Sequence, residues 1–422
     1  MPRIPLGRAA AISELTLQQL RTAPGVYWAE PAGQLRRGQD LIDDITLVAA
    51  THDASTALDA VAASVGVGRV GQRAAQFMAL AIDGVPVSLH CRPPETAGAL
   101  LLQLTGSETH LDRLRRLASD RRLSLDSEGL RAVDSRQLVA STEEDIYAAL
   151  GLPLIPAELR NDGEAIDVAL ASRLPALVSR ADIRGDLHMH THWSDGHDSI
   201  DDMAARCVAL GYEYMAITDH SPHSAASRNL SLDDIERQAD EIASVRERYP
   251  QMAILHGAEV DILPDGRLDF PDRVLRGLDV VLASLHDRAG HSPSKLLGRY
   301  EAAMKHPLVS IVTHPMNRSG PERPGYDLDV GRLFELAVET GTVLEVDGAP
   351  SHLDLESTLA RRAAQAGVTL SIDSDAHRPE MLERHMALGL LTARRGWVTP
   401  DHVLNVRSHA ELTDFLARKR TA

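Results

Sequence analysis

One segment of the chain, Asp186-Leu-His188-Met-His190-Thr-His-Trp-Ser-Asp195-Gly196, carries side chains of the types that bind metal ions. His188 and His190 follow a predicted strand and are one residue apart, so their imidazoles lie on the same side of it. Imidazole together with carboxylate is a ligand set for zinc, manganese or iron. Two histidines also stand close by chance in a chain that contains 19 of them. The interpretation therefore depends on the rest of the chain.

Short apolar runs follow, and each ends in a histidine or an acidic residue. They are residues 214–218 before Asp219-His220, 253–258 before Glu259, 280–285 before His286, 310–313 before His314, 342–344 before Glu345, and 368–372 before Asp373-Ser-Asp375-Ala-His377. Most are rich in β-branched residues, as is typical of strands buried on both faces. Helical patterns lie between them, at 203–210, 233–248, 296–305, 330–340 and 355–366. This alternation predicts a parallel sheet, and about seven such units favour closure into an α/β barrel.

In such a barrel the carboxyl ends of the strands open onto one mouth, so the polar residues that follow the strands are expected to meet there. The expected cluster consists of His188, His190, Asp195, His220, Glu259, His286, His314, Asp375 and His377. Its six imidazoles and three carboxylates suit roughly two or three divalent cations that share a bridging carboxylate. Satisfying loop backbones would explain one or two of these groups but not all of them.

Together these segments resemble the PHP phosphoesterase domain (polymerase and histidinol phosphatase), over residues 182–422. The matching motifs are His-x-His with Ser-Asp-Gly at 188–196, Ile-Thr-Asp-His at 217–220, Gly-x-Glu-Val-Asp at 257–261, Ala-Ser-Leu-His at 283–286, Thr-His-Pro at 313–315 and Asp-Ser-Asp-Ala-His at 373–377. The resemblance implies a PHP-type distorted (β/α)7 barrel. It also implies a ligand set for each of three cations: His188, His190, Glu259 and Asp375; Glu259, His286 and His314; and Asp195, His220 and His377.

Mn²⁺ or Zn²⁺ in these positions would generate a hydroxide near neutral pH and stabilise charge on a phosphate. The hypothesis is hydrolysis of a phosphoester by a metal-bound hydroxide, held by His188, His190, Glu259 and Asp375. Arg318, after the His314-Pro315 turn, is a candidate phosphate contact, and a surface arginine without a partner explains it equally well. Three further acids are expected to orient ligating imidazoles or to be structural, namely Asp219, Glu345 and Asp373.

The first 180 residues resemble the palm and thumb of a bacterial family X DNA polymerase. The matching segments are Ala32-Gly33-Gln34-Leu-Arg36-Arg37, Asp43-Asp44-Ile-Thr46, residues 87–95 and 104–110, and the junction at 142–147, 150–160 and 182–186. The resemblance implies a mixed α+β nucleotidyltransferase-like palm over 1–100, a thumb over 101–151 and a linker over 152–181. Because no helix-hairpin-helix or lyase region precedes the palm, we expect a member truncated at its N-terminus.

Three departures from that family affect the palm. Nucleotidyl transfer needs three carboxylates around two Mg²⁺ ions. Asp44 fills the first position, but Thr46 and Ser88 fill the others, and a hydroxyl lacks the charge that holds Mg²⁺. Asp43 cannot substitute, because neighbours in a strand face opposite sides. Gln34 replaces a serine near the incoming triphosphate. We therefore expect no polymerase activity from a palm that could still bind a nucleotide or a DNA end.

The composition, 422 residues with 44% hydrophobic and 25% charged, is that of an ordinary globular protein with two or three domains. A net charge of -16 argues against a strong hold on long duplex DNA. Arginines of a predicted helix at 111–122 could contact phosphates, although a solvated helix face explains them better. Two cysteines, Cys91 and Cys207, and the lack of a signal peptide or long apolar run predict a cytoplasmic protein without membrane association.

The sequence leaves three functions open. The first is a metal-dependent phosphoesterase that acts on nucleic-acid 3′ ends, as a 3′–5′ exonuclease or 3′-phosphatase, because a palm and thumb are attached to the barrel. The second is a phosphatase for a phosphorylated small molecule such as histidinol phosphate. The third is a DNA-end or nucleotide binding module whose barrel is only a support, against which the complete ligand set argues. The oligomeric state is not determined by the sequence.

Overall fold

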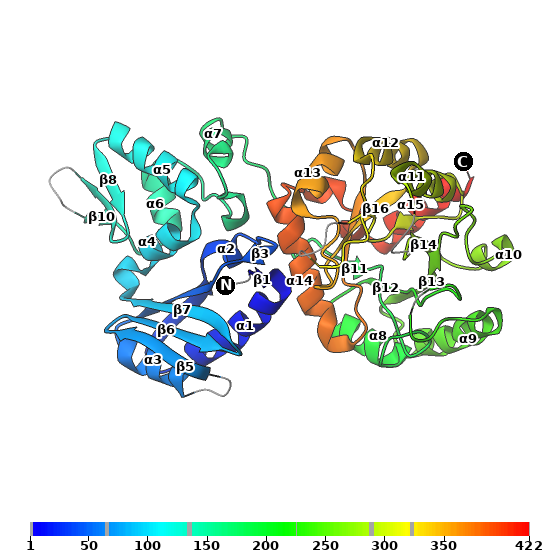
Figure 1. Ribbon diagram of the computed structural model, residues 1–422, viewed down its shortest axis with the longest axis horizontal. Helices are drawn as coiled ribbons and strands as arrows, with labels where there is room; N and C mark the ends of the chain where they lie inside the picture. The colour runs from blue at the N-terminus through cyan, green and yellow to red at the C-terminus, as the bar shows by residue number, and fades with distance from the viewer. Residues whose placement is uncertain are drawn as a thin grey trace. The chain divides into compact units, whose positions relative to one another are not determined.

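The computed structural model describes residues 3–63, 67–132, 137–224, 226–286, 291–320 and 325–421. The chain forms two compact units, Met1–Pro175 and Ala176–Ala422, whose elements are labelled in Figure 1. Within the described ranges, no helix combines the length and the apolar character that crossing a membrane requires. Both cysteines are buried thiols.

The first unit contains a five-stranded sheet in the order β2-β4-β7-β6-β5. Its strands are β2 (Val26–Pro31), β4 (Ile45–Thr51), β5 (Val67–Ala74), β6 (Phe77–Ile82) and β7 (Val85–Arg92). β4 and β7 are parallel neighbours, and the other pairs are antiparallel. A two-residue turn joins β6 to β7, and its Asp83 and Gly84 have φ of 49° and 76°. Asp-Gly suits this left-handed turn, because both positions need a positive φ.

The remaining elements of the first unit are mostly helical. They are β1 (Ile4–Pro5), α1 (Leu6–Thr22), α2 (Gly33–Arg36), β3 (Leu41–Ile42), α3 (Ala54–Ala62), α4 (Pro94–Thr105), α5 (Glu108–Asp120), β8 (Leu123–Asp126), β9 (Gly129–Ala132), β10 (Gln137–Val139), α6 (Glu143–Ala149), η1 (Ala157–Leu159) and α7 (Glu164–Leu170). The expected boundary after residue 100 falls inside α4, so the division into palm and thumb stays a prediction. Residues 152–175, expected as part of a linker, fold within this unit and bury Ile155, Leu159 and Ile166.

A buried ion pair connects this segment to the elements before it. The side chains of Arg160 and Glu143 are 1% and 4% exposed, and the guanidinium donates to the carboxylate. Arg36, on α2, donates to the other carboxylate oxygen at 2.8 Å, and Arg160 Nε donates to the carbonyl of Ile155 at 2.8 Å. Removing one member of such a network leaves a buried charge without its partner, which is strongly destabilising.

We expect Glu143→Ala to lower the free energy of unfolding of the first unit by about 3–5 kcal/mol, since Arg160 would stay buried without its carboxylate. Urea unfolding of the whole chain, with hydrogen exchange read on peptides of each unit, measures this loss. The control is Glu144→Ala, because Glu144 is the next residue of α6 and is exposed. Equal stabilities of the two variants would contradict the role given to the ion pair.

The second unit is a barrel of seven parallel strands in sequential order, β11 to β17. The strands are β11 (Gly185–Asp186), β12 (Tyr214–Ile217), β13 (Ala253–Asp261), β14 (Val280–Ser284), β15 (Ile311–Val312), β16 (Val343–Asp347) and β17 (Leu370–Asp373). A single bridge between Met189 and Ala376 brings the two edges of the sheet together and nearly closes it. The expected α/β barrel is thereby confirmed, with strands close to the predicted runs.

Helices alternate with these strands. They are α8 (Ile200–Ala209), α9 (Leu232–Arg248), α10 (Asp272–Leu275), α11 (Pro293–Met304), α12 (Val330–Thr340), α13 (Ser357–Gln365), α14 (Pro379–Arg395), η2 (Pro400–His402), η3 (Leu404–Val406) and α15 (His409–Thr421). Capping boxes define where two of them begin, Ser199 with Asp202 for α8 and Ser231 with Asp234 for α9. Each box satisfies backbone N–H groups that the first turn of a helix leaves open.

Two apolar layers hold the barrel together, and they come from alternate residues of the same strands. One layer lies between strands and helices and includes Val281, Leu344 and Ile372. The other combines strand residues such as Leu282 with Leu412 of α15. Its strand members are Tyr214, Ala216, Leu255, Val280, Leu282, Ile311 and Val343. They fill the interior near the amino ends of the strands. Because side chains alternate along a strand, later residues in the same register also point inward.

Candidate metal centre

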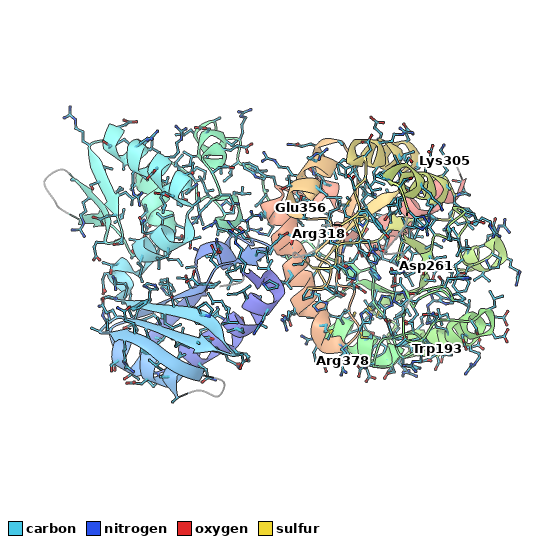
Figure 2. All side chains as sticks on the ribbon, viewed as in Figure 1. Trp193, Asp261, Lys305, Arg318, Glu356 and Arg378 are labelled. Atoms are coloured by element: carbon cyan, nitrogen blue, oxygen red, sulfur yellow. The ribbon has the colours of Figure 1, made fainter. Side chains whose placement is uncertain are left out.

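The alternation of side chains along each strand explains which polar residues point into the barrel. Leu255 belongs to the interior layer, so Glu259 and Asp261, four and six residues later on β13, point the same way. By the same rule Val343 is followed by Glu345 and Asp347 on β16. All of these carboxylates are buried. Figure 2 shows the side chains of this unit as sticks, with Asp261 and Arg318 labelled. The interior is thus apolar at one end of the strands and polar at the other.

The carboxylate of Glu259, which is fully buried, lies at the middle of the polar cluster. Its Oε1 lies 2.9 Å from Nε2 of His314 and 3.3 Å from Nε2 of His286. Its Oε2 lies 2.7 Å from Nδ1 of His220, and 3.7 Å from Nε2 of both His188 and His190. One carboxylate is therefore surrounded by five imidazoles, as expected of a group that bridges cations.

The other two predicted carboxylates lie on either side of His377. Asp375 Oδ1 lies 3.0 Å from Nε2 of His190, 3.6 Å from Nε2 of His188 and 3.8 Å from Nδ1 of His377. Asp195 Oδ1 lies 3.2 Å from Nε2 of His377 and 3.5 Å from Nε2 of His220. The structure thus brings all nine predicted side chains to one place, at the carboxyl ends of the barrel strands.

The donor atoms fall into overlapping groups whose members lie within 4.8 Å of one another. These groups are His190, Asp195, His220 and His377; His188, His190 and Asp375; and His220, Glu259 and His286. They overlap with the three ligand sets that the resemblance implies but differ from them. His190 also joins Asp195, His220 joins Glu259, Glu259 is not grouped with His188, and His314 is in none of these groups. The division of ligands among cations therefore remains a proposal.

The arrangement fits a bound cation better than a network of hydrogen bonds. Oε2 of Glu259 and Nδ1 of His220 are 2.7 Å apart, yet both atoms are buried and neither has a hydrogen-bond partner among the described residues. Nδ1 of His190 is also buried without a partner there. Unpartnered buried polar atoms are costly, whereas atoms that face a common cation lie close together without bonding to one another.

Electrostatics favour the ligand form of the carboxylates and the protonated form of most of the imidazoles. Burial lowers the pKa of His286 and His377, but the neighbouring carboxylates outweigh it and raise these values to about 10 and about 9, so a cation must displace a proton from each ring. Burial disfavours the carboxylate of Glu259, but His220 and His286 outweigh burial and hold its pKa well below the usual value. Burial lowers the pKa of His190 to about 3, and His220 and His377 act in the same direction. A charged carboxylate and a neutral imidazole are the forms that bind metal ions.

Residues around the centre hold two of its imidazoles in place. Glu345 accepts a hydrogen bond from Nδ1 of His188 at 2.7 Å and another from the backbone N–H of His314 at 2.8 Å. Asp261 lies 3.0 Å from Nδ1 of His286. Asp261 ends the Gly-x-Glu-Val-Asp motif, but it was not among the predicted site residues. Its spacing of two from Glu259 was the available signal.

The other two acids expected to act on imidazoles act elsewhere. Asp219 accepts hydrogen bonds from Thr191 and Ser194, and therefore shapes the loop that carries Asp195. It also accepts from Gln238 at 2.7 Å. Asp373 accepts from the backbone N–H of Leu187 at 2.8 Å. The hydrogen bonds of these two carboxylates agree with the structural role, which is one of the two roles expected for them, and not with the orientation of an imidazole. Their strands end before the ligands, so the side chains meet loop backbones.

Arg318 lies in the loop after β15. Its backbone N–H donates to Asp354 at 3.2 Å and its guanidinium donates to the carbonyl of Leu353 at 2.8 Å. The guanidinium is therefore hydrogen-bonded to a neighbouring loop, and its contact with a phosphate stays a prediction.

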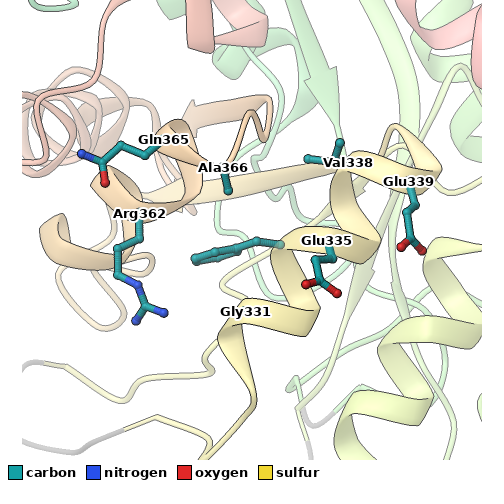
Figure 3. A pocket seen from close by; sticks show the side chains of 8 residues that line it. Gly331, Glu335, Val338, Glu339, Arg362, Gln365 and Ala366 are labelled. Atoms are coloured by element: carbon teal, nitrogen blue, oxygen red, sulfur yellow. The ribbon is translucent and has the colours of Figure 1, made fainter.

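A pocket between α12 and α13, lined by Phe334 and Arg362 among others (Figure 3), contains none of the predicted ligands.

In the first unit, the three positions expected to carry catalytic carboxylates do meet. Thr46 and Ser88 are paired across the parallel strands β4 and β7, so their side chains share one face. Thr46 Oγ1 donates to Asp44 at 3.1 Å. Asp43 and Asp44 precede β4 rather than lie within it, and Asp43 instead contacts Gln34 at 2.8 Å. This corner thus has one carboxylate and two hydroxyls.

Comparisons with known proteins agree with both units. Residues 100–161 match the family model of the DNA polymerase beta thumb, and residues 186–317 match that of the PHP domain. The DNA polymerase/3′-5′ exonuclease PolX of Bacillus subtilis is 34% identical over 433 residues, 99% of this chain and 73% of that protein. A probable phosphatase of Syntrophotalea carbinolica is 30% identical over 244 residues, 55% of this chain and 95% of that protein.

The parallel barrel with its ring of histidines and carboxylates is a PHP domain, and the names of its relatives support a phosphoesterase, which is a hydrolase. The remainder of the chain carries a polymerase thumb. The chain belongs to the family X DNA polymerases that have a PHP domain.

We expect Glu345→Gln to weaken Mn²⁺ binding by about 10–100-fold, because His188 would lose the charged acceptor that fixes its ring and its tautomer. Calorimetric titration of metal-stripped protein with Mn²⁺ measures the change. Glu335→Gln is the control, since Glu335 lies on α12 with a side chain that is 66% exposed. Unchanged affinity in the Glu345 variant would show that this carboxylate does not support the centre.

Proposed function

We propose that this protein is a metal-dependent phosphoesterase that removes nucleotides or phosphate from nucleic-acid 3′ ends. The observation that carries the proposal is the meeting of six imidazoles and three carboxylates, five of the imidazoles around Glu259, in a chain that also carries a polymerase thumb. The thumb supports a nucleic-acid substrate. So does the relative that matches 99% of the chain, which is named as a polymerase and 3′-5′ exonuclease.

Some residues of the centre would bind cations, and others hold those ligands in position. His188, His190, Glu259 and Asp375 would hold one cation, Glu259 with His286 and His314 a second, and Asp195, His220 and His377 a third. Bound cations would supply the activation of water and the positive charge that phosphoester hydrolysis needs. Glu345 keeps the proton of His188 on Nδ1, so Nε2 presents its lone pair to the centre.

The surroundings of the centre keep it rigid and partly dry. His188, Glu259 and His314 are at most 2% exposed, whereas the side chains of Asp195 and His377 are 23% and 28% exposed. The more exposed pair therefore lies where a phosphate would enter. A pre-organised, poorly solvated site strengthens electrostatic stabilisation of charge that develops on the phosphate.

A phosphatase for small phosphate esters is the second candidate. It is favoured by the relatives named as probable phosphatases, which match 55% and 48% of the chain. The two candidates differ in the size of substrate that they accept. They do not differ in the chemistry of the centre.

We expect the purified protein with Mn²⁺ to shorten a 5′-labelled primer stepwise, and His188→Ala to abolish the ladder, because His188 would hold a cation. Histidinol phosphate and an aryl phosphate are assayed in parallel. The control is His306→Ala, since His306 precedes β15 at the other end of the barrel and contacts Asp272. Turnover of the small esters alone would favour the phosphatase. DNA retention on a filter without any turnover would favour a binding module.

We propose further that the palm does not polymerise, since Thr46 and Ser88 occupy two carboxylate positions. A primer–template with dNTPs and Mg²⁺ should give no extension. The variant Thr46→Asp with Ser88→Asp returns two carboxylates to the side of Asp44, and we expect it to incorporate nucleotides measurably. Both assays use the His188→Ala background, so that digestion does not hide extension. Extension by the chain with Thr46 and Ser88 intact would contradict this proposal.

A further inference from the structure

A smaller group of ligating side chains lies beside the centre and outside the nine predicted residues. Asp347 ends β16, and His352 lies in the loop that follows. Together with Asp375 they each offer a ligand atom within 4.8 Å of the other two. Neither Asp347 nor His352 was among the predicted site residues, since neither belongs to one of the motifs and His352 does not follow a strand directly.

His352 is held in the orientation and tautomer of a ligand. Its Nδ1 lies 2.9 Å from the backbone carbonyl oxygen of Arg318. A carbonyl oxygen only accepts, so Nδ1 carries the proton, and Nε2 of the neutral ring keeps its lone pair. The ring also stacks on His314, with centroids 4.8 Å apart and planes 17° apart. Metal-ligating histidines are commonly fixed by such a bond from their other nitrogen.

Asp347 presents a buried carboxylate oxygen to the same place. The residue is fully buried. Its Oδ1 accepts from the backbone N–H of Ala349 at 2.6 Å, while Oδ2 has no hydrogen-bond partner within the described part of the chain. The neighbouring carboxylate, Asp375, is only 6% exposed. Two buried carboxylates side by side repel each other when charged, and a cation between them would relieve that repulsion.

The loop that carries these residues is fixed in advance. Asp347 and Asp354 exchange backbone hydrogen bonds of 2.5 and 3.3 Å. The carboxylate of Asp354 in turn accepts from the backbone N–H of Met316 at 3.0 Å. The group is therefore anchored to both β16 and the loop after β15, and it needs no rearrangement to bind a ligand.

We propose that Asp347, His352 and Asp375 form a further divalent-cation subsite, adjacent to the three groups of the centre. One imidazole nitrogen with two carboxylates suits Mn²⁺ or Zn²⁺. Three protein ligands leave at least one coordination position open to water or to a phosphate oxygen. The subsite rests on the proposed metal centre, because it shares Asp375 with that centre.

The test is the number of ions bound by the whole chain. Protein is stripped with a chelator, loaded with Mn²⁺ and desalted, and its metal content is measured by mass spectrometry. We expect His352→Ala and Asp347→Asn each to bind one Mn²⁺ fewer than the unmodified chain. His52→Ala is the matched control, since His52 belongs to the first unit and its side chain is 56% exposed. Anomalous diffraction from Mn²⁺-loaded crystals should show a peak between Asp347 and His352.

The outcomes separate the subsite from the centre. If the unmodified chain binds no Mn²⁺, the proposed centre itself fails. If it binds Mn²⁺ while both variants bind equally many ions and no anomalous peak appears beside His352, the subsite is overturned and the centre stands. If both variants lose every ion, the subsite is likewise overturned, because these residues would then support the centre as a whole.

Discussion

The structure of the barrel depends on one buried carboxylate, that of Glu259. A lone carboxylate in a protein interior is far too costly to remain charged. This one is surrounded by five imidazoles from four other segments of the chain, at 2.7–3.7 Å. These segments follow different strands, so they surround Glu259 only when the strands are assembled into the barrel. Metal binding and the closure of the sheet therefore depend on each other.

Strand alternation lets one barrel satisfy that constraint and still have an apolar core. The inward residues near the amino ends, such as Leu255 and Leu282, pack with Leu412 of α15. The inward residues near the carboxyl ends are ligands or their supports. Stability and chemistry are thus separated along the barrel axis. A substitution near the amino ends of the strands should change stability, whereas one near the carboxyl ends should change the chemistry of the site.

The same geometry has another consequence in the first unit. Asp44, Thr46 and Ser88 meet at one corner, because β4 and β7 are parallel and in register. Their side chains bring one carboxylate and two hydroxyls to this corner. Conversely, Glu143 and Arg160 are charged residues on which the unit does depend, because both are buried.

The sequence by itself determined the barrel, its order of strands and helices, and the nine residues of the centre. It could do so because the predicted ligands lie within a strand or a few residues after one, apart from Asp195 in the loop between β11 and α8, and parallel strands deliver their ends to one mouth. The contacts that depend on the paths of the loops were decided only by the tertiary structure. Asp219 and Asp373 bind loop backbones, residues 152–175 fold onto the first unit, and His352 reaches Asp347 and Asp375. Contacts of this kind have no period in the sequence, because a loop has no repeating geometry that fixes where its side chains point.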